Sequence, residues 1–177
     1  RRSSDLDRPV DILHDGFDCV IRTGALPEDG VIARPLGKLT MVNCASPHYL
    51  TRFGYPQSPD DLTSHAIVRY TPHLGVHPLG FEVASVNGVQ WFKSGGMLTV
   101  NSSENYLAAG LAGLGIIQIP RIAVREALRA GRLIEVLPGY RAEPLSLSLV
   151  YPQRRELSRR VNLFMQWLAG VMKEHLD

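Results

Sequence analysis

The chain has 177 residues, of which 45% are hydrophobic and 20% are charged, and its formal net charge is +2. This composition fits one globular unit with a sizeable core, or two smaller lobes. It holds no long basic block, which argues against direct nucleic-acid binding by this segment. No run of about 18 apolar residues predicts a membrane span. The first residues, RRSSDLDRPVD, lack the apolar core of a signal peptide, so we expect a cytoplasmic protein.

The two cysteines, Cys19 and Cys44, lie in apolar segments typical of strands. Free, buried thiols in a reducing compartment are therefore the expected state. The chain begins at Arg1 rather than at Met, and no strand precedes the first helical pattern. We interpret this as a fragment or a processed chain.

Apolar runs bounded by Gly and Pro predict strands and helices in alternation. The first half is expected to contain a helix over Asp7–Gly16, strands over Phe17–Ile21, Val31–Leu36 and Leu39–Cys44, a helix from Pro47 to Arg52 closed by Gly54, a loop over Tyr55–Asp61, a strand over Ala66–Tyr70 and a loop over Thr71–Gly80. Asn87-Gly88 predicts a hairpin between Phe81–Val86 and Val89–Lys93.

The second half continues the alternation. It is expected to contain a strand over Met97–Val100, a helix after the polar cluster Asn101–Glu104, a strand over Gly115–Ile119, a helix from Pro120 to Gly131, strands over Leu133–Leu137 and Leu145–Tyr151, and a long amphipathic helix over Leu157–Leu176. This order predicts an α/β fold with mixed, mostly parallel sheets. We expect two lobes, one from residues 1–44 and 147–177 and one from residues 45–146, joined by two connecting strands.

The most informative segment is the polar cluster Asn101, Ser102, Ser103 and Glu104, which follows a strand and opens a helix. Small ligands bind at the carboxyl ends of strands in open α/β sheets, and the unpaired N–H groups of a helix start favour anions. The other interpretation is a capping box, with Asn101 as cap and Glu104 three residues later. The two roles are compatible.

Five stretches in order, DGFDCVIRTG, ASPHYL, GYPQSPDDLTSH, AGLGIIQIP and GRLIEVL, resemble the effector-binding domain of LysR-type transcriptional regulators over nearly the whole chain. The resemblance implies a periplasmic-binding-protein-like fold with a small organic effector, anionic in class, between two lobes. It implies a winged helix-turn-helix domain that binds DNA ahead of this segment, and a homodimer or homotetramer of the full-length protein. We interpret the sequence as departing from this pattern in three ways: it lacks the DNA-binding domain, it lacks the first strand and helix, and Phe81 stands where a Trp is usual.

Further ligand candidates follow from strand ends and from the resemblance. Arg22, Thr23 and Gly24 follow a predicted strand, and Arg22 is suited to a carboxylate unless it pairs with Asp18 or faces solvent. Ser46 contacts the ligand or caps the helix after Pro47. The weaker candidates, Tyr70 and Gln118, either contact the ligand or are simply packed.

No motif predicts catalysis, a metal site or a cofactor. His73 and His77 are four residues apart, but Pro72, Gly75 and Pro78 argue against a helix between them. No nucleophile elbow or phosphate-binding glycine loop occurs. We therefore expect a sensor rather than an enzyme, and a transporter's solute-binding protein of the same fold is the alternative. The apolar side chains Phe164, Trp167 and Leu168 are expected to pack in the core, with an interface stripe as the alternative.

Overall fold

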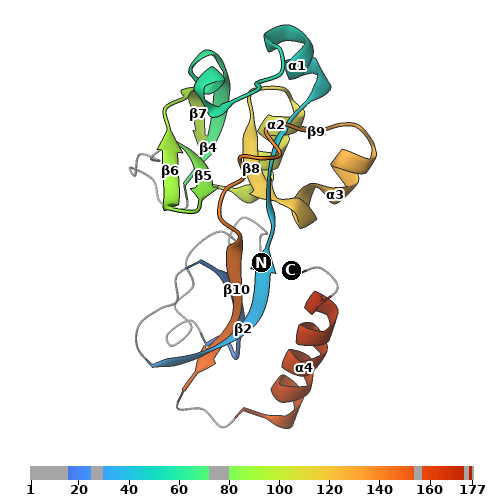
Figure 1. Ribbon diagram of the computed structural model, residues 1–177. Helices are drawn as coiled ribbons and strands as arrows, with labels where there is room; N and C mark the ends of the chain where they lie inside the picture. Colours follow the sequence, from blue (N-terminus) through green and yellow to red (C-terminus); the bar gives the residue numbers. More distant parts are fainter. Residues whose placement is uncertain (1–15, 25–29, 72–79, 154–156, 174–175, 177) are drawn as a thin grey trace. The chain divides into compact units, whose positions relative to one another are not determined.

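The computed structural model describes residues 16–24, 30–71, 80–153, 157–173 and 176. It divides into two compact units: the described residues of unit 1 lie within Met41–Glu143, and unit 2 combines the described residues of Pro9–Thr40 and Pro144–Asp177. Figure 1 labels most elements of both. Most of the helix expected over Asp7–Gly16 lies outside the described residues.

Unit 2 is built on a three-stranded antiparallel sheet in the order β1-β10-β2. β1 is Val20–Thr23, β2 is Val31–Leu39 and β10 is Leu145–Pro152. Helix α4, Arg159–Lys173, packs beside β2. The LSLSLVY alternation of β10 places Leu147 and Leu149 in the core of the unit, together with Met165 of α4.

Unit 1 begins with β3 and the helix that follows it. β3 (Met41–Ala45) is buried along its length and lies between β8 (Ile117–Pro120) and β9 (Ile134–Glu135) in an antiparallel sheet. Helix α1 (Pro47–Phe53) ends at Gly54 as predicted, because Gly54 takes a φ of 80° that favours glycine. Part of the expected Tyr55–Asp61 loop belongs to the 3-10 helix η2, Pro59–Ser64.

The remaining strands of unit 1 form two pairs. β4 (Ala66–Tyr70) runs parallel to β7 (Gly95–Val100), and a parallel bridge between Ile67 and Ile116 continues this pairing toward β8. The predicted hairpin is confirmed as β5 (Phe81–Ser85) and β6 (Gly88–Phe92). The α/β character and the mixed sheets are as expected, but most described strand pairs are antiparallel, because β3 and β10 each lie between strands that run the other way.

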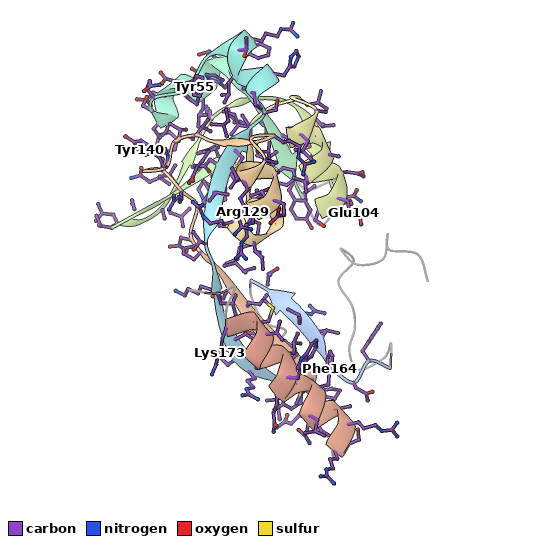
Figure 2. All side chains as sticks on the ribbon, turned by 90° about the vertical axis from the view of Figure 1, so that its right-hand side faces the viewer. Tyr55, Glu104, Arg129, Tyr140, Phe164 and Lys173 are labelled. Carbon is purple, nitrogen blue, oxygen red and sulfur yellow. The ribbon has the colours of Figure 1, made fainter. Side chains whose placement is uncertain are left out.

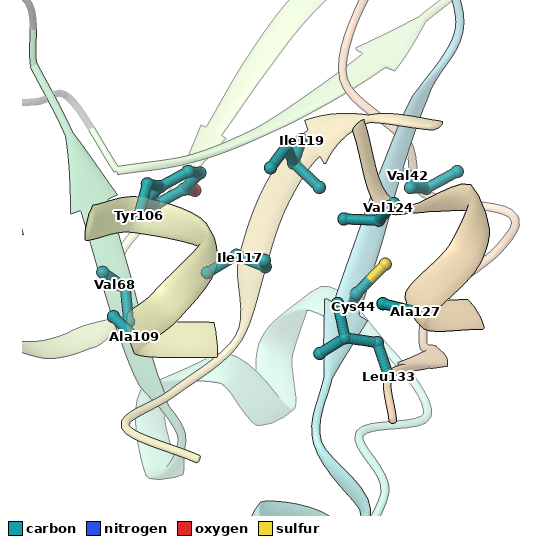
Figure 3. Packing of buried hydrophobic residues seen from close by; sticks show 10 residues of the cluster. All are labelled: Val42, Cys44, Val68, Tyr106, Ala109, Ile117, Ile119, Val124, Ala127 and Leu133. Carbon is teal, nitrogen blue, oxygen red and sulfur yellow. The ribbon is translucent and has the colours of Figure 1, made fainter. Parts of the chain in front are cut away.

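Two helices cover one core of unit 1. α2 (Ser103–Leu111) packs on β4, and α3 (Arg121–Arg129) packs on β8. Figure 3 shows how Tyr106 and Ala109 from α2, and Val124 and Ala127 from α3, meet the strand side chains. The cluster is completed by Val42, Cys44, Val68, Ile117, Ile119 and Leu133.

A second core of unit 1 surrounds a buried hydroxyl–imidazole pair. The Tyr49 hydroxyl lies 3.0 Å from His65 Nδ1 and accepts a hydrogen bond from the Ala66 N–H at 2.9 Å. His65 is buried, and burial lowers the pKa of its imidazole below the usual range, although the charge of Asp61 opposes this. Burial in the folded protein therefore favours the neutral form of the His65 imidazole.

This pair predicts a loss of stability in acid. Because the pKa of His65 is lower in the folded than in the unfolded state, its contribution is fully present above pH ~6.5 and is lost as the pH falls through the folded-state pKa, with a slope of at most about 1.4 kcal/mol per pH unit. Urea unfolding between pH 7.5 and pH 4.5 checks this. The difference in free energy of unfolding between the wild type and His65→Gln should shrink as the pH falls. A constant difference would contradict the prediction.

Candidate functional site

The site candidates of unit 1 lie where two parallel strands end. Tyr70, the last residue of β4, pairs in register with Val100, the last residue of β7, and the Thr71 N–H donates to the Val100 carbonyl at 2.9 Å. Asn101 and Ser102 follow directly. The parallel pairing therefore brings Tyr70 next to the polar cluster, at the sheet edge where ligands of α/β proteins bind.

Helix α2 begins one residue later than the capping-box interpretation requires. Ser102, not Asn101, is the N-cap: its backbone is extended, and its carbonyl accepts the first helical hydrogen bond from the Tyr106 N–H at 2.9 Å. The Ser102 side chain makes no capping hydrogen bond. The Asn101–Glu104 box is thus wrong, because Ser103 is already helical and the spacing is shifted. Ser102 keeps a half-buried hydroxyl beside the helix start, and Asn101 and Ser103 are exposed.

Two tyrosine rings pack against each other at this sheet edge. The rings of Tyr70 and Tyr106 lie 5.7 Å apart, and the Tyr106 hydroxyl accepts a hydrogen bond from the Gln118 N–H at 2.8 Å. Burial raises the pKa of Tyr106 well above its usual range, so this hydroxyl stays protonated. Tyr106 therefore links the helix start to β8 and fixes the position of the edge.

Both polar atoms of the Gln118 side-chain amide make hydrogen bonds. Its Nε2 donates to Asn43 Oδ1 at 3.0 Å and to the Glu82 carbonyl at 2.8 Å, and its Oε1 accepts from the Glu82 N–H at 2.9 Å. Asn43, fully buried on β3, in turn donates to the carbonyls of Leu137 and Tyr140. The packed alternative for Gln118 fits these bonds, which tie the β5–β6 hairpin to the sheet.

Sequence reasoning missed Asn43 and Glu82 in this network. A signal existed for Asn43, because an amide within the apolar run LTMVNC needs buried hydrogen-bond partners. No pattern pointed to Glu82, whose role comes mainly from its backbone.

Ser46 lies at the opposite end of α2 from the polar cluster. It is buried, its hydroxyl accepts a hydrogen bond from the Tyr49 N–H at 3.2 Å, and a side chain at Gly113 would meet it at 3.0 Å. Because Gly113 follows the C-terminal end of α2 and nine helical residues span about 13 Å, Ser46 and Ser102 are not brought together. The structure shows the capping role of Ser46.

The candidate ligand residues of unit 2 lie at the end of a strand rather than in a loop. Arg22 and Thr23 are the last residues of β1, which is shifted along the chain from the expected Phe17–Ile21 because it pairs with β10, Thr23 facing Leu147. The Gly24 N–H donates to the Ser146 carbonyl at 3.0 Å. Thr23 and Gly24 are exposed, and Arg22 is half-buried.

Burial disfavours the nucleophilic thiolate form of both cysteines. Burial raises the pKa of the Cys44 thiol to about 12, and burial and the charge of Asp18 raise the pKa of the half-buried Cys19 thiol. Both cysteines are free. In the described parts of the chain, no three His, Cys, Asp or Glu side chains gather as metal ligands would. None of the helices described is long and apolar enough to cross a membrane.

The relatives found by comparison with known proteins are transcriptional regulators of the HTH type. The chain is 99% identical over 171 residues to the HTH-type transcriptional regulator YhjC of Escherichia coli K12, covering 97% of this chain and 57% of that protein. It is 31% identical over 166 residues to the HTH-type transcriptional activator AaeR of the same organism, covering 93% and 52%. The chain thus spans about half the length of the curated relatives it matches. The transporter alternative is not supported, because these relatives are transcriptional regulators.

A solved structure shares the fold. The regulatory domain of CrgA, a LysR-type transcriptional regulator from Neisseria meningitidis, superimposes with a TM-score of 0.79 at 24% identity, over 92% of this chain and 78% of that one. The profile of the family described as the LysR substrate binding domain matches residues 2–173. With this match over nearly its whole length, the chain belongs to the LysR substrate-binding domain family.

Proposed function

We propose that the chain is the effector-sensing part of a LysR-type transcriptional regulator, and that a small anionic organic molecule binds at the edge formed by Tyr70, Asn101, Ser102 and the start of α2. The observation that carries this proposal is the Ser102 hydroxyl, which sits at a helix N-terminus beside the carboxyl ends of two parallel strands and makes no capping bond. The helix start supplies backbone N–H donors and a positive dipole end, which favour a carboxylate. Tyr70 adds a half-exposed ring for the organic part of the ligand.

The proposal extends to the rest of the regulator. We take units 1 and 2 as the two effector-binding lobes, and we propose Arg22, with Thr23 and Gly24, as a carboxylate-binding group of unit 2. In the full-length protein we expect a helix-turn-helix domain to bind DNA, a homodimer or homotetramer, and a cytoplasmic location. Effector binding acts by favouring one of two states, which requires a different affinity for each. No chemical step is expected.

The test is a thermal-shift screen of the chain against aliphatic and aromatic carboxylates. A ligand at about 100 times its Kd stabilises the folded state by about 2.7 kcal/mol, which is roughly 5–10 °C in Tm for a protein of this size. We expect Ser102→Ala to lose most of this shift while its Tm without ligand stays within about 1 °C of wild type, because the side chain makes no cap bond.

Ser46→Ala is the matched control. It removes a hydroxyl that does cap a helix, so it should lower the Tm without ligand by an amount equivalent to ~1 kcal/mol and leave the ligand-induced shift intact. If Ser46→Ala abolished the shift and Ser102→Ala preserved it, the ligand would bind at the other end of α2 and the proposed edge would be wrong.

A further inference from the structure

The side chain of Arg69 on β4 carries a buried hydrogen-bond donor that no described residue accepts. Its Nη2 donates to the Ser94 carbonyl at 3.1 Å. Arg69 Nε and Ser94 Oγ, in contrast, are both closed off from solvent and have no hydrogen-bond partner among the residues that the structure describes. The ion pairs in those parts of the chain involve Arg121, Arg129 and Arg141, not Arg69. A guanidinium and a hydroxyl of two bonded neighbours thus keep unused hydrogen-bonding capacity in a buried place.

Two glycines at the start of β7 determine where the guanidinium lies. A Cβ at Gly96 would be 3.1 Å from Arg69 Nε and 3.2 Å from its Cζ, and a Cβ at Gly95 would be 2.9 Å from the His65 carbonyl oxygen. Glycine therefore lets β7 approach β4 this closely and lets the guanidinium lie against the strand backbone. The Nε–H is held in place by the fold before any ligand arrives, which favours binding.

The chemistry of the two unused groups calls for an anion. A buried polar group without a partner is destabilising, and more so when it is charged. A guanidinium does not lose its proton in proteins, so Arg69 cannot avoid this cost by becoming neutral. An anion accepts a charge-assisted hydrogen bond from the Nε–H, accepts a second from the Ser94 hydroxyl, and balances the positive charge.

The enclosure of the two atoms restricts the size of that anion. Neither atom has accessible surface, although Arg69 and Ser94 are half-buried as whole residues. A ligand that contacts both atoms therefore has to be about as small as a single ion. Phosphate and carboxylate groups bring further oxygens that each need a donor, whereas a halide ion does not. We propose that Arg69 and Ser94 form a binding site for a small inorganic anion of the size of chloride.

This anion site is separate from the proposed effector edge. Successive side chains of a strand point to opposite faces of the sheet. Val68 and Tyr106 of α2 share one core, and the Tyr70 ring contacts the Tyr106 ring, whereas Ile67 belongs to the other core of unit 1. Arg69 therefore lies on the face of β4 that is opposite to α2, and the inference does not depend on the effector site.

Exchanging chloride for gluconate at constant ionic strength tests the proposal. Gluconate is too large for the site, so the two salts differ in anion binding and not in screening. At about 150 mM chloride and a Kd on the order of 15 mM, binding to the folded state lowers the unfolding equilibrium constant about tenfold, which is roughly 3–5 °C in Tm. Arg69→Lys keeps the charge but lacks the Nε–H, and Ser94→Ala lacks the hydroxyl, so both should lose most of this shift.

Matched controls make the same two changes in unit 2. Arg34→Lys and Ser146→Ala alter exposed residues and should keep the full chloride-dependent shift. Ser94→Ala should also be at least as stable as the wild type in gluconate, because it removes a buried hydroxyl that no described residue bonds. A purely structural hydroxyl would instead lower the Tm equally in both salts. A wild-type Tm that is the same in both salts, or a shift that either site variant retains in full, would overturn the proposal.

The two tryptophans allow the unfolding of unit 1 to be followed by itself. Trp91 lies on β6 of unit 1, and Trp167 lies on α4 of unit 2. The expected core packing is wrong for Trp167 and for Phe164, which Figure 2 labels on α4, because these side chains are 61% and 48% exposed. Trp167→Phe therefore removes the second fluorophore with little effect on stability. In this background the fluorescence of Trp91 reports the unfolding of the unit that contains the anion site.

Bromide locates the anion directly. It resembles chloride in charge and chemistry, and it scatters X-rays anomalously near its absorption edge. Crystals of the chain grown in bromide should show an anomalous peak within hydrogen-bond distance of Arg69 Nε and Ser94 Oγ, and crystals of Arg69→Lys should not. An ordered water at that position without an anomalous signal would overturn the proposal, because the water would then accept the buried donor.

Discussion

Replacing Asn43 with Asp is expected to destabilise unit 1 by about 4 kcal/mol, although the two side chains have nearly the same shape. Asn43 is fully buried, and its Nδ2 donates to the carbonyls of Leu137 at 3.2 Å and Tyr140 at 2.9 Å. The substitution replaces Nδ2, which supplies both N–H donors, with a single oxygen that faces both carbonyl oxygens, and it buries a negative charge without a cationic partner.

The loss of stability on replacing Asn43 is increased by the turn from Leu137 to Tyr140, which the Asn43 side chain stabilises. Leu137 has a φ of 48°, an uncommon conformation for a residue with a side chain, which costs of order 1 kcal/mol or more. The Asn43 bonds to the carbonyls at both ends of this turn keep it in place.

Urea unfolding at pH 7.5 measures the effect. Asn105→Asp is the control, because Asn105 is exposed in the first turn of α2, where a negative charge is tolerated or favourable. Its free energy of unfolding should stay within about 0.5 kcal/mol of wild type. A loss below about 1 kcal/mol for Asn43→Asp would show that the turn does not depend on this amide.

Gly115→Ala is expected to cost about 2–4 kcal/mol, a large effect for one methyl group. A Cβ at this position would lie 2.6 Å from the Ala66 carbonyl oxygen, which is backbone and cannot rotate away. That oxygen accepts the Ile116 N–H at 2.9 Å, and the Ile116 carbonyl accepts the Val68 N–H at 3.0 Å. The added methyl group therefore forces apart the bridge that connects β4 to the chain entering β8.

Gly139→Ala is the matched control, since a Cβ there meets nothing within 4 Å. Thermal or urea unfolding should place Gly139→Ala within about 0.5 kcal/mol of wild type. If both alanine variants were equally stable, the close approach of Gly115 to Ala66 would not contribute to the native packing.

The elements that the sequence predicted best are those determined by local chemistry. Helix α1 is bounded by Ser46-Pro47 and Gly54, and the β5–β6 hairpin turns at Asn87-Gly88, so a few adjacent residues specify each. The predicted β1 began three residues too early and ended two residues too early, because pairing with β10, more than 120 residues away, decides which part of FDCVIRT is extended. Local apolar patterns contain no information about that partner.

In the candidate site, too, the features set by adjacent residues were predicted and those set by distant partners were not. The polar cluster at the end of β7 was visible as a pattern, and the parallel pairing with β4 places Tyr70 beside it. The start of α2 was misjudged by one residue, since Asn101 and Ser102 are both good caps. The engagement of Gln118 depends on Asn43 and Glu82, which are 75 and 36 residues away along the chain. Such a network follows from tertiary structure alone.

The division of the chain has a consequence for its synthesis. The described residues of unit 1 all lie between Met41 and Glu143, whereas β1 and β2 of unit 2 find their described strand partner only in β10, with Leu39 pairing to Leu145. At 5–20 residues per second, a ribosome needs roughly 5–20 s to make the intervening hundred residues. Unit 1 can therefore finish folding during translation while β2 waits with both edges unpaired. The nascent chain is most exposed to misassociation in this interval, so a ribosome pause placed shortly before β10 should lower the yield of native protein more than one placed after it.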